Sequence, residues 1–114
     1  MAFPGTYNFS YYRGDTAEFV VRPKASNGSA YTLTDYDAEF TIANRRGSTG
    51  SQYTAQAVVD EANSLVTCTI LPTLGRTLTP GAYVYDVQIN NGPSEIFTLL
   101  TGTITITDDV TGAV

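Results

Sequence analysis

The stretch LTPGAYVYDVQI, residues 78–89, determines the fold class that this chain is expected to adopt. After its Pro-Gly turn, every second residue is large and apolar. This apolar set is Tyr83, Tyr85, Val87 and Ile89. Successive side chains of a β-strand point to opposite faces, so a period of two predicts a strand with one buried face. The stretch therefore predicts a sheet that is covered on one side.

The same period of two recurs along the chain between clusters of turn residues. It predicts strands over 17–23, 36–43, 66–70 and 100–107, and two weaker ones over 7–12 and 53–59. β-Branched and aromatic residues prevail in these segments, as is typical of strands. Together with residues 83–89, they predict an all-β sandwich of about seven antiparallel strands. A short helical turn is expected within residues 71–78, where the chain crosses between the sheets.

The composition limits both the expected number of domains and the classes of function that the chain can have. The chain has 114 residues, 42% of them apolar, which suits a single domain over residues 1–114. Residues 1–6 are apolar without a clear period and are expected to form an N-terminal arm that packs on a partner. Histidine is absent, which excludes Ser-His-Asp catalysis and histidine-ligated metals. We expect no enzyme activity and no cofactor.

The net charge and the N-terminal sequence limit the expected partners and the expected compartment. The net charge of −5 argues against nucleic acid or an anionic membrane surface as the main partner. The first residues lack the basic and apolar regions of a secretory signal, and no apolar stretch is long enough to span a bilayer. The single cysteine, Cys68, suits a reducing compartment. We therefore expect synthesis in a cytoplasm.

The segment LTPGAYVY, residues 78–85, resembles the tyrosine corner of immunoglobulin-like sandwiches. Tyr85 occupies the position at which antibody domains carry a cysteine, and the chain has no tryptophan. The sequence thus resembles an immunoglobulin-like domain without the antibody disulfide.

The order of cues along the whole chain resembles the small immunoglobulin-like domains of tailed-bacteriophage virions, including the N-terminal domain of baseplate upper proteins. These cues are YRGDT at 12–16, LTDYDAEF at 33–40, LTPGAYVYDV at 78–87 and LLTGTITIT at 99–107. The resemblance implies a structural protein of the virion that acts through protein–protein contacts. Since baseplate upper proteins continue into a long coiled coil, a small acidic chain that stops here is more similar to a capsid decoration protein. A tail, neck or baseplate adaptor is the alternative.

Side chains outside the strongest strands are the expected contacts to the major capsid protein or other virion proteins. Tyrosine and arginine are preferred anchors at interfaces, and residues 45–51 form a basic loop on an acidic chain. The predicted interface residues are Phe3, Tyr7, Tyr11, Tyr12, Arg45, Arg46 and Tyr53. Self-association is a further possibility. Tyrosines also stack on sugars, so a carbohydrate-binding or adhesion module that recognises a host-surface glycan remains the alternative of another class.

Four other features have simpler interpretations. The Arg13-Gly14-Asp15 tripeptide suits a turn before a strand better than integrin recognition. Cys68 alternates with apolar neighbours and is expected in the core. Two sets of carboxylates are weaker candidates for a functional site. A calcium site would use Asp35, Asp37, Asp108 and Asp109, and a glycosidase-type carboxylate pair would use Glu18 and Glu39.

Overall fold

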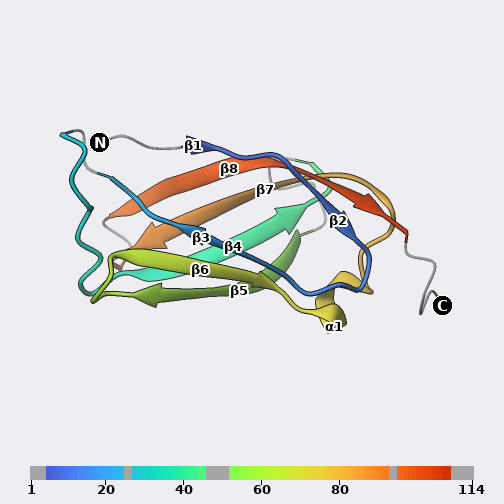
Figure 1. Cartoon of the computed structure of the whole chain (residues 1–114), viewed down its shortest axis with the longest axis horizontal. Helices are drawn as coiled ribbons and strands as arrows, with labels where there is room; N and C mark the ends of the chain where they lie inside the picture. Colours follow the sequence, from blue (N-terminus) through green and yellow to red (C-terminus); the bar gives the residue numbers. More distant parts are fainter. Residues whose placement is uncertain (1–4, 25–26, 46–51, 93–94, 109–114) are drawn as a thin grey trace.

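The computed structural model describes residues 5–24, 27–45, 52–92 and 95–108, and this part of the chain is almost entirely β-structure (Figure 1). The predicted all-β fold is confirmed. The strands are β1 (Gly5–Thr6), β2 (Phe9–Tyr12), β3 (Ala17–Val21), β4 (Asp37–Ala43), β5 (Gln52–Asp60), β6 (Leu65–Ile70), β7 (Gly81–Asn90) and β8 (Ile96–Thr107). The helix α1 (Pro72–Gly75) lies between β6 and β7, where a helical turn was expected.

The strands form two layers that share β5. Neighbouring strands follow the order β1-β8-β7-β4-β5-β6-β3, with β2 also paired to β8. The first half of β5 pairs with β4, as in the pair Phe40 and Ala55, and its second half pairs with β6, as in Ala57 and Cys68. The layer β4-β7-β8 thus faces the layer β5-β6-β3. This is the strand arrangement of an immunoglobulin-type sandwich.

The pairing of the N-terminal strands differs from the purely antiparallel arrangement that the sequence predicted. Both β1 and β2 pair with β8 in parallel, as in the pairs Thr6 with Thr101 and Tyr12 with Thr107. The cause is topological, because β2 must end where β3 begins, and β8 ends at that same end of the sandwich. Gly5 and Thr6, placed in the arm by sequence analysis, thus belong to the sheet; residues 1–4 lie outside the described residues.

Aromatic side chains fill the centre of the core. Tyr85 is 2% exposed, and its ring lies 5.5 Å from the ring centroids of both Phe9 and Phe40. Phe19 of the opposite layer packs edge-on against Phe40 at 5.4 Å. Offset and edge-on arrangements of this kind are favourable for aromatic pairs. The aromatic cluster therefore joins the two layers at the point where an antibody domain has its disulfide.

The tyrosine corner is present. The Tyr83 hydroxyl accepts a hydrogen bond from the Thr79 backbone N–H at 3.1 Å and lies 3.0 Å from the Thr79 hydroxyl. The Tyr83 ring is buried. This bond connects the loop after α1 to the start of β7, so the prediction from residues 78–85 is confirmed.

Because β8 contains a β-bulge, the last strand begins earlier than the sequence pattern predicted. Val87 pairs with Leu100, but Gln88 pairs with Thr98, which leaves Leu99 as an extra residue in β8. The strand therefore begins at Ile96 instead of residue 100. The period of two changes phase at a bulge, so a search for regular alternation stops there.

Candidate interaction surface

Two of the predicted contact residues, Tyr12 and Arg45, lie at the same end of the sandwich. Here β2, β4 and β8 end, β3, β5 and β7 begin, and α1 lies between them (Figure 1, right-hand end). We call this the α1 end, and it comprises residues 12–16, 43–45, 71–81 and 106–108. Tyr12 is 58% exposed there, and Arg45 is also exposed. Arg46 and Phe3 lie outside the described residues.

Tyr11 is a core residue, and its prediction as a contact residue is wrong. It is 3% exposed because the inward phase of β2 falls on Phe9 and Tyr11, which leaves Ser10 and Tyr12 outside. The Tyr11 hydroxyl donates a hydrogen bond to the Asp15 carbonyl. It lies so close to Gly75 that a Cβ on that glycine would stand 1.9 Å from the hydroxyl oxygen. Desolvation raises the pKa of Tyr11. The buried Tyr11 side chain thus connects β2 to α1.

The two other predicted tyrosines are partly accessible. Tyr7, between β1 and β2, is 47% exposed and stacks on Phe9 with a centroid distance of 5.3 Å. Tyr53 is half-buried and packs edge-on against Tyr83 at 6.4 Å. Tyr12 and, to a lesser extent, Tyr7 are therefore accessible to a partner, whereas Tyr53 contributes largely to the rim of the core.

The Arg13-Gly14-Asp15 tripeptide is a structural turn. Nε of Arg13 donates to the Leu78 carbonyl at 3.0 Å, and its Nη2 donates to the Arg76 carbonyl at 2.8 Å. Gly14 has a φ of +89°, a conformation that favours glycine. The arginine is thus occupied in holding the β2–β3 turn against the loop after α1.

The structure does not bring the candidate acidic residues together. Asp37 pairs with the far end of β7, whereas Asp108 follows β8 at the α1 end and lies 3.7 Å from an Arg13 Nη1 atom. Glu18 and Glu39 project from the outer faces of opposite layers. Asp109 is outside the described residues. Across the described ranges, no three His, Cys, Asp or Glu residues lie together as a metal site would require.

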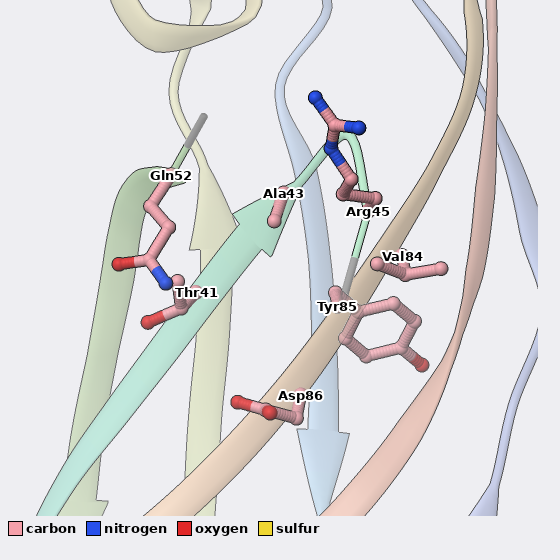
Figure 2. Close-up of a pocket in the computed structure, with 7 residues that line it drawn as sticks. All are labelled: Thr41, Ala43, Arg45, Gln52, Val84, Tyr85 and Asp86. Carbon is pink, nitrogen blue, oxygen red and sulfur yellow. The ribbon is translucent and has the colours of Figure 1, made fainter. Parts of the chain in front are cut away.

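Two hollows are lined by described residues of β4, β5, β7 and α1. The smaller has a volume of about 90 Å³ and lies between β4, β5 and β7 (Figure 2). Figure 2 shows Thr41 and Asp86 on neighbouring strands, with Arg45 beyond the end of β4. Small-molecule pockets usually enclose roughly 300–1,000 Å³, so this hollow suits a few waters.

The larger hollow was not anticipated from the sequence. It has a volume of about 320 Å³ and runs between β5 and α1. Leu71, which is 44% exposed, and Leu74 line it. The signal for Leu71 was present, because the inward phase of Val66, Cys68 and Ile70 places the next residue outside. Leu71 adds an apolar side chain to the α1 end.

Cys68 provides a direct test of the core. It is fully buried, and desolvation raises the pKa of its thiol from 9.0 to about 12. We expect a thiol reagent to label the native protein at a negligible rate at about pH 8 and to label it rapidly in urea. Above pH 9 the unfolded thiol ionises while the native thiol stays protonated up to about pH 12, so rising pH favours unfolding across this window.

The urea midpoint should therefore fall between about pH 9 and pH 11, and it should fall less in Cys68→Val, whose side chain does not titrate. Equal labelling rates for native and unfolded protein would contradict the burial of Cys68.

None of the helices in the described part of the chain has the length and apolar character needed to cross a membrane.

No protein-family model matches the chain, and no curated protein sequence matches it. Solved structures that the chain matches distantly include an internalin-like protein of Listeria monocytogenes, with a TM-score of 0.47 and 12% identity. Another is a family 123 glycoside hydrolase from Clostridium perfringens, with a TM-score of 0.41 and 14% identity. Each match covers 93% of this chain, but only 28% and 23% of the respective structures. These similarities are too distant to assign a function.

Proposed function

We propose that this chain is a non-enzymatic structural protein of a tailed-phage virion, best described as a capsid decoration protein that binds neighbouring virion proteins. The sequence resemblance to phage immunoglobulin-like domains motivates the proposal. A tail, neck or baseplate adaptor is the alternative location, because the same contacts would serve either assembly.

The observation that carries the proposal is the exposure of Tyr12 at the α1 end. A tyrosine with 58% of its surface in water is poised to bury much area on a partner at low entropic cost. Arg45 and Leu71 are exposed at the same end, so aromatic, apolar and cationic contacts are available together. Arginine is suited to carboxylates on a partner.

Cosedimentation with particles that lack the protein tests this surface. We expect Tyr12→Ala to weaken binding by about tenfold or more, as is typical of a hot spot, and Tyr12→Phe to retain most of it. Thr34→Ala is the matched control, since Thr34 is exposed in the turn before β4, whose first residue Asp37 pairs with Asn90 at the opposite end of the sandwich. Equal binding by Tyr12→Ala and the wild type would show that this end is not the contact.

Glycan binding is the second candidate, favoured by the same exposed ring. Sugars stack on tyrosine faces, and Tyr7 provides a second accessible ring. Retention on a glycan array that Tyr12→Ala abolishes and Tyr12→Phe preserves would support it. Absence of retention on every polysaccharide would remove this candidate.

A further inference from the structure

The strand β3 ends one of the two layers. It pairs with β6 on one side, and no strand of the described chain pairs with its other side. In immunoglobulin domains the first strand commonly covers this position. Here β1 and β2 pair with β8 instead (Figure 1). Alternate backbone N–H and C=O groups of β3 are therefore left for another strand.

The accessibility of side chains agrees with an open edge. Ala17 and Phe19 point into the sandwich but remain half-buried. In the adjacent strand, the inward residues Val66, Cys68 and Ile70 are fully buried. Ala17 and Phe19 are thus more accessible than the inward residues of β6, whereas Val21, the third inward residue of β3, is buried.

The open part of the β3 edge, residues 17–22, lacks the usual features that prevent strand addition. Proteins protect such edges with proline, lysine, bulges or very short strands. Ala17–Val21 contains no proline, glycine or lysine, and its pairing with β6 is regular over all five residues. Beyond Arg22, the Pro23 carbonyl accepts a hydrogen bond from the Tyr31 N–H at 3.0 Å and Lys24 pairs with Ala30, so the open edge ends there. The opposite edge is different, because β1 and β2 are short and their pairing with β8 is interrupted between Thr6 and Phe9.

The sequence of β3 together with the following residue, Arg22, is complementary to itself in an antiparallel pair. If a two-fold axis passes beside Val20, residue numbers that face each other sum to forty, so Glu18 faces Arg22 of the partner subunit. The symmetric pair forms at the same time. Glu18, Val20 and Arg22 are all exposed, and Val20 faces its own copy at the centre. Opposite charges that face each other across strands stabilise pairing.

An apolar row extends from this centre. Val20 pairs with Thr67 of β6, which pairs with Val58 of β5. Val20 is 39% exposed and Val58 is 54% exposed, both on the outer face of the layer. In a two-fold pair the two rows would join into one continuous row across both subunits.

We propose that the chain forms a homodimer by antiparallel pairing of β3 with β3 of a second copy, centred on Val20. The layer then becomes a continuous sheet in the order β5-β6-β3-β3-β6-β5. Such an isologous interface repeats each contact twice, so the two Glu18–Arg22 pairs set its register. The proposal does not depend on whether the chain belongs to a virion.

A charge-exchange experiment in sedimentation equilibrium tests the proposal. The wild-type protein should show a monomer–dimer equilibrium between about 1 μM and 1 mM. Glu18→Arg or Arg22→Glu alone turns two attractive pairs into two repulsive ones and should raise the dimer dissociation constant about tenfold or more. The double variant Glu18→Arg, Arg22→Glu restores opposite charges and should dimerise like the wild type.

A mixture of the two single variants provides the most stringent test of the pairing. Each carries like charges on β3, but the mixed pair is complementary, so a heterodimer should form from two chains that fail to self-associate. Lys24→Glu controls for net charge, because it changes the charge as Arg22→Glu does, while Lys24 pairs with Ala30 of its own chain beyond the open part of the edge.

Three outcomes would overturn the proposal. They are a wild-type protein that stays monomeric at about 1 mM, a dimer unaffected by either single variant, and equal dimer loss in Lys24→Glu and Arg22→Glu. Circular dichroism of each single variant, with the unfolding midpoint of the wild type as reference, separates a lost interface from a lost fold. If the edge instead accepts a strand of another protein, the chain alone stays monomeric and the first outcome applies.

Discussion

Tyr85→Ala is expected to destabilise the protein by about 3–5 kcal/mol, the range for removing a large buried ring. The ring is 2% exposed and contacts aromatic side chains from β2, β3 and β4. Since small domains have about 5–15 kcal/mol of stability in total, this variant should be partly unfolded at 37 °C or close to it. Urea unfolding followed by far-UV circular dichroism measures the loss.

Tyr85→Phe separates the hydroxyl from the ring. The hydroxyl donates to the Tyr7 carbonyl at 2.6 Å, so its removal leaves a carbonyl near the core without its donor. The expected cost is about 1–3 kcal/mol. Tyr12→Phe removes an exposed hydroxyl and should change stability by less than about 0.5 kcal/mol. If Tyr85→Ala lost less than Tyr85→Phe, the central position of the ring would be refuted.

Gly102→Ala should release the N-terminal strands from β8. A Cβ on Gly102 would stand 1.9 Å from the Tyr7 carbonyl oxygen, which is backbone and has little room to move. The chain crosses β8 here at close range, with the Tyr7 N–H bonded to the Thr101 carbonyl at 3.0 Å and the Asn8 side chain bonded to the Thr103 N–H at 3.0 Å. We expect a loss of about 1–3 kcal/mol.

Amide hydrogen exchange locates this effect. In Gly102→Ala the amides of Tyr7 and of β2 should lose protection, whereas those between β4 and β7 should keep it. Thr103→Ala, a neighbouring change on the exposed side of β8, is the matched control. Unchanged protection of Tyr7 in Gly102→Ala would show that the N-terminal segment does not approach β8 in this way.

Local features of the fold were predictable because they depend on neighbours in the sequence. The period of two from Tyr83 to Ile89 located β7 and its buried face. The tyrosine corner joins Tyr83 to Thr79, four residues earlier. Both patterns are short enough to be recognised without the rest of the chain.

Long-range features were not predictable in this way. The parallel pairing of β2 with β8 and the division of β5 between two layers depend on which distant strands become neighbours. Tyr11 was misjudged for the same reason, since its hydroxyl is accommodated by the absence of a side chain at Gly75. The candidate surface was predictable only in part, with Tyr12 and Arg45 exposed as expected and Leu71 overlooked.

Copy number and position on purified phage particles test the proposed function most directly. Quantitative mass spectrometry would count the protein relative to the major capsid protein, and gold labelling would locate it. A decoration role predicts many copies spread over the head, and a few copies confined to the tail or neck would favour the adaptor instead. Absence from the particles would contradict the virion proposal.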